Sequence, residues 1–171
     1  EWHCDTERIV LCGFSAGGHL AASYAALWNR DFIQNTLGLS AEILRPNGAI
    51  LCYPVITSGD FAHRYSFDAL LGKRRDSAET LRLVSVEEQV GDDVPPMFIW
   101  HTFSDDTVPV ENALKMADAL AAYKIPVELH IFPKGGHGLS LCDERTTSCS
   151  CGIQSDCAVW MDMASRWLYN L

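Results

Sequence analysis

A serine between glycines offers a nucleophile near the start of the chain. Ser15 lies in the segment GFSAGG (residues 13–18), a G-x-S-x-G pattern preceded by the strand-length apolar run Arg8–Gly13 and followed by a helical pattern. A sharp strand–turn–helix of this kind exposes the hydroxyl at the end of a sheet, and glycines let neighbouring backbone pass close to it. We predict Ser15 as a nucleophile and the Ala16 N–H as an oxyanion donor. The alternative is a glycine-rich turn with a capping serine.

A serine nucleophile needs a base, and six histidines compete for that role. His137 is the strongest candidate, because it follows a predicted strand in the glycine-flanked loop 133–138 and is free to reach across the strand ends. A generic exposed loop histidine is the alternative. The remaining histidines fit other roles, because they lie near the chain start, in the first helix, in an irregular region or inside strands: His3, His19, His63, His101 and His130.

The base in turn needs an orienting carboxylate. Asp105 and Asp106 both follow the predicted strand 97–102, and a carboxylate there can meet a histidine that follows the adjacent strand. One of the two is expected to orient the base and the other to be a solvated or helix-capping carboxylate; spacing alone does not choose between them. Asp92 and Asp93 precede the strand and therefore lie at its wrong end.

Alternating strand and helix patterns position these groups. Continuous apolar runs predict strands at 8–13, 48–53, 97–102 and 127–132. Helical spacing predicts helices at 17–28, after Pro109 and at the chain end, with short helices at 66–71 and 77–90. Strands that alternate with helices imply right-handed crossovers, so we predict an α/β fold with a parallel sheet buried on both faces.

Composition limits the classes of protein that the chain can belong to. Its 171 residues suit about one domain, and 48% hydrophobic with 20% charged residues is a globular balance that excludes disorder. The net charge of −9 disfavours nucleic-acid binding, so we expect no such partner. No run approaches 18 apolar residues, so we also expect no membrane span. The expected location is the cytoplasm, with secretion left open because the chain opens at Glu1 without Met.

Seven cysteines, an odd number, argue against a complete disulfide framework. Cys12 and Cys52 lie in strand-like runs, where a thiol behaves as a small apolar group. The favoured interpretation of the last cluster is free thiols in a reducing compartment, and the alternatives are a local disulfide or a metal site. That cluster comprises Cys142, Cys149, Cys151 and Cys157.

Four segments together resemble the acetyl-xylan-esterase-like α/β-hydrolases, relatives of carbohydrate esterases from bacteria that degrade plant polymers. They are GFSAGGHLA, PNGAILCYPV, PPMFIWHTFSDDTVPVENALKMADAL and PVELHIFPKGGHGLSL. The resemblance covers about residues 6–141 and the terminal helix. It implies a Ser15, Asp105, His137 triad, because the family pattern H-x-x-x-D-x-x-V-P selects Asp105 over Asp106. Three residues beside the reacting strand ends are either pocket lining or ordinary core: Phe14, Tyr53 and Val108.

The resemblance implies a serine carboxylesterase that removes short acyl groups, acetyl above all, from a small-molecule or oligosaccharide ester such as xylan. An esterase of this kind is expected to need no metal and no organic cofactor. The family carries an upstream His-Gly-Gly motif and four further strands, neither of which occurs here. We therefore expect residues 1–171 to be one partial catalytic domain, the C-terminal part of an α/β-hydrolase fold with the N-terminal strands absent. The alternatives are a prolyl-oligopeptidase-like peptidase and an inactive fragment.

Overall fold

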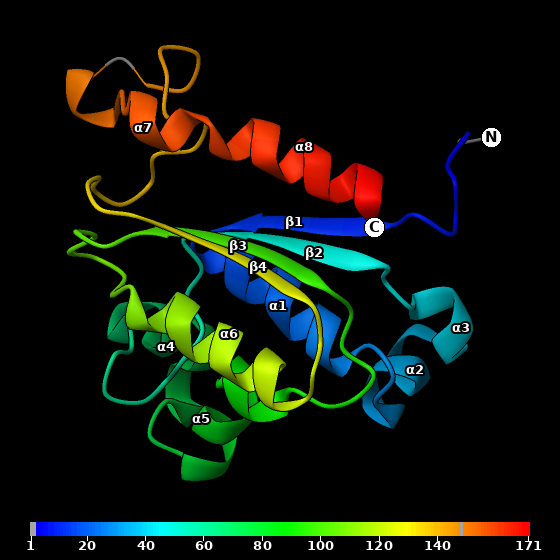
Figure 1. Ribbon diagram of the computed structural model, residues 1–171. Coiled ribbons are helices and arrows are strands. Elements are labelled where there is room, and N and C mark those ends of the chain that lie inside the picture. The colour runs from blue at the N-terminus through cyan, green and yellow to red at the C-terminus, as the bar shows by residue number, and fades with distance from the viewer. Residues whose placement is uncertain (1–2, 148) are drawn as a thin grey trace.

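A four-stranded parallel sheet with helices on both faces forms the framework of the protein (Figure 1). The computed structural model describes residues 3–147 and 149–171. The strands follow one another in the order of the chain: β1 (Val10–Phe14), β2 (Gly48–Cys52), β3 (Met97–Thr102) and β4 (Val127–Phe132). The predicted α/β class and the four parallel strands are confirmed.

The register brings the C-terminal ends of the strands to one edge of the sheet. Phe14 of β1 pairs with Cys52 of β2, and Thr102 of β3 pairs with Phe132 of β4. Because the strands are parallel, the loops that follow β1, β3 and β4 all leave from this edge. These three loops carry the predicted nucleophile, acid and base.

Helices cover the sheet in two layers. Figure 1 shows α1 and α6 on one face and α8 on the other. Two short 3₁₀ turns flank α5, at Gly72–Arg74 and Val86–Gln89, and a third lies at Ser150–Gly152. The α-helices are α1 (Ala16–Leu27), α2 (Asp31–Leu37), α3 (Ala41–Leu44), α4 (Arg64–Leu71), α5 (Ala78–Val84), α6 (Glu111–Ala122), α7 (Ser155–Ala158) and α8 (Trp160–Asn170).

Side chains along the central strands alternate between the two faces of the sheet and therefore pack into two separate cores. In β2, Ala49 and Leu51 pack into the layer of α1 and α6, whereas Ile50 packs into the opposite layer with Trp160 of α8. The alanines of α1 that face the sheet are buried, and their small side chains let the helix approach closely. This close approach places the first turn of α1 beside the end of β2, where the nucleophile turn is formed.

The helix predicted at 77–90 is interrupted. The α-helix α5 ends at Val84, and Ser85 adopts an extended backbone. The Ser85 hydroxyl accepts a hydrogen bond from Ser58 N (3.0 Å), and Val86 N donates to Ile56 O (3.2 Å). These bonds to the segment after β2 replace the helical bonds of the next turn, which propensity alone does not reveal.

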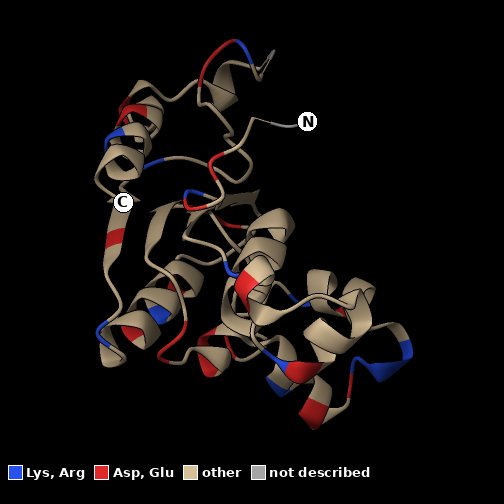
Figure 2. Ribbon diagram, turned by 90° about the vertical axis from the view of Figure 1, so that its right-hand side faces the viewer, with Lys and Arg blue, Asp and Glu red and all other residues tan. Residues whose placement is uncertain are grey.

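Charged residues of both signs are distributed along the chain (Figure 2). The run Lys73–Arg75 after α4 is adjacent to Asp76, which pairs with Arg64 at 3.6 Å and with Arg75 at 3.7 Å. None of the described helices combines the length and the apolar character that crossing a bilayer requires.

Candidate active site

The turn between β1 and α1 holds Ser15 in a backbone conformation that is rare for residues other than glycine. Its φ is 53° and its ψ is −118°. Ser15 N donates to Cys52 O (3.0 Å), and Ser15 O accepts from Val55 N (3.2 Å), so β2 and the segment after it fix the turn. Such a conformation costs about 1–3 kcal/mol and persists where the surrounding structure holds it. The sequence motif therefore forms the sharp turn between strand and helix that was expected of it.

The side chains of Ser15, His137 and Asp105 form one continuous hydrogen-bonded relay. Ser15 Oγ lies 2.7 Å from His137 Nε2, and His137 Nδ1 lies 2.7 Å from Asp105 Oδ2. An ionised carboxylate only accepts hydrogen bonds, so the imidazole proton belongs on Nδ1 and Nε2 is free to accept from the hydroxyl. The structure thus brings together three residues that are 122 and 32 positions apart in the chain. The arrangement can deprotonate the serine.

Asp105 rather than Asp106 contacts the imidazole. Its carboxylate is buried, and Oδ1 accepts from Thr107 N (3.0 Å) and Val108 N (2.9 Å). Burial alone raises the pKa of Asp105, but the hydrogen bonds from His101, His137 and the two amides outweigh it and hold this pKa well below its usual range. Asp106 is exposed. The carboxylate that faces His137 is therefore ionised at neutral pH.

Several contacts fix the loop that carries His137. Gly135 O accepts from Thr102 Oγ1 (2.9 Å) and Ser104 Oγ (3.0 Å), which ties this loop to the acid loop after β3. Gly135 has a φ of 143°, and a Cβ there would lie 2.7 Å from Thr102 Cγ2, so glycine is required. Sequence reasoning missed Thr102 and Ser104, because no motif marks hydrogen bonds between distant loops.

Tyr53 contacts the same loop from the protein core. Its ring meets the His137 imidazole edge-on at a centroid distance of 5.1 Å, and its hydroxyl accepts from Ser140 N (2.9 Å). Burial raises the pKa of Tyr53 to about 12, so the hydroxyl stays neutral. Tyr53 was a candidate pocket residue, but only 4% of it is exposed. It belongs to the core beneath the site.

The other two candidate pocket residues differ in exposure. Val108 has no exposed surface and is a core residue, which was the alternative to pocket lining. It packs with Val55 and Phe67 beneath the acid loop. Phe14 is half-buried at the end of β1 and remains a candidate for substrate contact.

The backbone amide of Ala16 is available to a ligand. Ala16 is the first residue of α1 and is exposed. Within the described ranges, its N–H donates no backbone hydrogen bond. A free amide at a helix N-terminus beside the serine is suited to hold a negatively charged oxygen.

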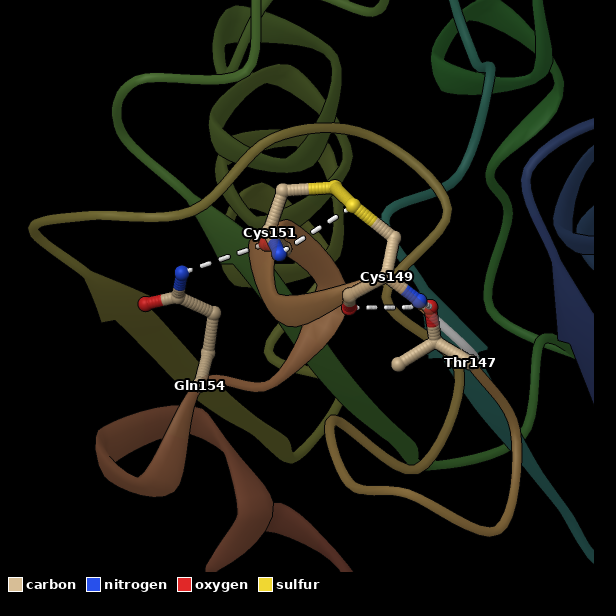
Figure 3. The surroundings of a disulfide bond; sticks show 4 residues. All are labelled: Thr147, Cys149, Cys151 and Gln154. Atoms are coloured by element: carbon tan, nitrogen blue, oxygen red, sulfur yellow. Dashed lines mark hydrogen bonds between the residues drawn. A yellow bond between two sulfur atoms is a disulfide. The ribbon is translucent and has the colours of Figure 1, made fainter.

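The favoured prediction, that all four clustered cysteines are free thiols, is wrong for two of them. Cys149 and Cys151 form a disulfide (Figure 3), whereas Cys142 and Cys157 are free and buried. The turn at 150–152 brings the Cα atoms of the pair to 5.2 Å, within the range that a disulfide spans. Over residues 3–147 and 149–171, no group of three or more His, Cys, Asp and Glu side chains could hold a metal ion.

His19 makes the stability of the chain depend on pH. It is buried in α1, and its Nε2 lies 2.8 Å from Val84 O. Burial is the main cause that lowers its pKa from the ordinary 6.5. The unfolded chain therefore binds a proton at this histidine more readily than the folded chain does, so the folded state loses stability as pH falls below about 6.5.

His19→Gln is expected to remove this part of the pH dependence, because an amide also donates to Val84 O but does not titrate. Urea unfolding at pH 7.5 and 5.5 should show that the original chain loses more free energy of unfolding than the variant does. The difference is at most about 1.4 kcal/mol for each pH unit below the unfolded pKa. Equal losses in both proteins would contradict this assignment.

Comparison with known proteins identifies two relatives of this chain by sequence. The chain is 41% identical over 146 residues to the endo-1,4-beta-xylanase B of Butyrivibrio fibrisolvens, covering 85% of this chain and 22% of that protein. It is 29% identical to the acetylxylan esterase of Xylanibacter ruminicola, covering 80% of this chain and 27% of that protein.

Solved structures of similar fold are esterases and hydrolases. The acetyl ester-xyloside bifunctional hydrolase of Caldicellulosiruptor lactoaceticus superposes with a TM-score of 0.80 at 37% identity, over 97% of this chain and 57% of that one. The carboxylesterase Cest-2923 of Lactobacillus plantarum superposes with a TM-score of 0.82 at 29% identity, over 98% and 60%.

The fold and the relay place the chain among the α/β-hydrolases. The BD-FAE family model matches residues 1–120, and the chain belongs to this family. It spans about a quarter of the length of the curated relatives and 57–60% of the two solved structures.

Proposed function

We propose that this chain carries the nucleophile, base and acid of a serine ester hydrolase that removes acetyl or other short acyl groups. The observation that supports this most strongly is the relay Ser15 Oγ, His137 Nε2 and Nδ1, Asp105 Oδ2, with 2.7 Å at both contacts. A strained serine, an oriented imidazole and a buried ionised carboxylate form the set of groups that acyl transfer requires.

The proposed reaction has two halves. His137 Nε2 takes the proton of Ser15 Oγ as the oxygen attacks the ester carbonyl, and the Ala16 N–H stabilises the oxyanion of the tetrahedral intermediate. The carbon–oxygen bond to the alcohol then breaks, and His137 delivers the proton to the leaving alcohol. Water, deprotonated by His137, attacks the acyl-enzyme and releases the carboxylic acid and the free Ser15. Asp105 holds the imidazole in the productive tautomer throughout. Every proton in this scheme moves between Ser15, His137, water and the substrate.

The proposed substrate is an acetyl ester on xylan or a xylo-oligosaccharide. The names of the relatives support it, since one is an acetylxylan esterase and another an acetyl ester-xyloside hydrolase. Phe14 is the candidate for contact with the acyl or sugar group. The cytoplasm remains the proposed location.

Ser15→Ala is expected to lower turnover of p-nitrophenyl acetate and of acetylated xylo-oligosaccharides to the rate of the buffer, a loss of at least about 10³-fold, because the attacking oxygen is gone. Ser40→Ala is the matched control: Ser40 is exposed and far along the chain from the relay, and its loss should change kcat by less than twofold.

Three outcomes would overturn the proposal. Retained turnover in Ser15→Ala would exclude Ser15 as the nucleophile. Hydrolysis of proline peptide amides without hydrolysis of acetate esters would make the protein a peptidase. The absence of any turnover by the original chain would leave it without the proposed activity.

A further inference from the structure

A second histidine touches the acid of the relay from inside the protein. His101 lies in β3 and has no exposed surface. Its Nε2 lies 2.9 Å from Val108 O and 3.3 Å from Asp105 Oδ2. Its other ring nitrogen, Nδ1, is buried and has no hydrogen-bond partner among the residues that the structure describes.

These contacts determine the protonation of His101. A backbone carbonyl and an ionised carboxylate are both acceptors, so the ring nitrogen that faces them carries a proton. A proton on Nδ1 as well would leave a charged imidazolium with a buried N–H group that has no acceptor, which is costly. Nε2 of His101 therefore carries the N–H that faces both acceptors.

We propose that His101 is a positioning residue for the proposed ester hydrolysis: its Nε2–H is shared between Val108 O and Asp105 Oδ2 and fixes the carboxylate that orients His137. The inference rests on the proposed function of the relay. His101 touches neither Ser15 nor His137 in the hydrogen bonds of the structure and acts through Asp105.

The two oxygens of Asp105 explain why such a donor matters. Oδ1 is held by the amides of its own loop, Thr107 N and Val108 N. Oδ2 is the oxygen that His137 uses, and His101 Nε2 also lies 3.3 Å from it. Because His101 also binds Val108 O, one N–H fixes both the loop and the carboxylate. Without it, the carboxylate can turn about its side-chain bonds, and a displacement of about 1 Å in such a group costs about 10²-fold in rate.

A matched pair of variants separates this role from simple filling of the core. His101→Gln places an amide N–H near the position of Nε2, whereas His101→Met has an unbranched side chain of similar length and no donor. For p-nitrophenyl acetate, we expect Met to lower kcat about 10- to 100-fold with KM within about twofold, and Gln to recover most of that loss. His130→Met is the control, since His130 lies in β4 and contacts Glu128 instead.

A second measurement does not depend on activity. The proton on His137 Nδ1, in a 2.7 Å contact with a carboxylate, should give a ¹H NMR signal far downfield of the backbone amides. We expect this signal in the original chain and in His101→Gln, and its shift or loss in His101→Met. Full kcat and an unchanged signal in His101→Met would overturn the inference, as would equal impairment of both variants. If the original chain shows no turnover, the proposed function fails, and the NMR comparison still decides the role of His101.

Discussion

Asp105→Asn is expected to lower kcat for acetate esters about 10⁴-fold, whereas Asp106→Asn should leave it within about twofold. The amide can present its N–H₂ group to His137 Nδ1, which would then accept instead of donate and place the imidazole proton on Nε2. A protonated Nε2 cannot take the proton of Ser15, although the two atoms still lie close together.

This pair of variants also tests the choice between neighbouring carboxylates. Asp105 is buried and in contact with the imidazole, and Asp106 is exposed. Steady-state kinetics on both variants, with circular dichroism to check folding, gives the answer. A large loss in Asp106→Asn together with an active Asp105→Asn would show that Asp106, and not Asp105, is the acid.

Gly13→Ala is expected to have the largest effect on stability. A Cβ at this position would lie 2.1 Å from Gly17 O and 2.5 Å from Gly17 C, both backbone atoms of the first turn of α1. Neither can move without opening the turn that holds Ser15, so we expect a loss of at least about 3 kcal/mol in the free energy of unfolding, or failure to fold.

Gly17→Ala is the matched control within the same motif. A Cβ there meets no atom within 4 Å, and alanine favours a helix over glycine by about 1 kcal/mol. Urea unfolding should therefore find Gly17→Ala as stable as the original chain or more stable. Equal stability of Gly13→Ala and the original chain would show that α1 does not approach β1 as closely as described.

The extent to which the sequence predicts this site depends on how local each signal is. Ser15 and the strand–turn–helix around it are predictable, because residues 8–28 contain the whole pattern. The choice of Asp105 needs either the family pattern or the fold, since spacing alone allows Asp106. Only the fold shows that Val108 is fully buried and that Thr102 and Ser104 tie two loops together, because these facts depend on distant segments.

Cysteine pairing shows the same limit. The spacing of Cys149 and Cys151 does not tell a disulfide from two free thiols, since the outcome depends on how the intervening turn brings their Cα atoms together. The interruption after α5 is similar, because bonds of Ser85 and Val86 to the segment after β2 end the helix.

Labelling with a fluorophosphonate is the sharpest test of the relay of Ser15, His137 and Asp105, because this reagent forms a covalent bond with a serine that an organised base activates. Intact mass and peptide mapping should find one adduct per chain, on Ser15. Ser15→Ala should carry none, and Asp105→Asn should react far more slowly than Asp106→Asn. An adduct on another residue, or no adduct on the folded chain, would show that His137 and Asp105 do not activate Ser15.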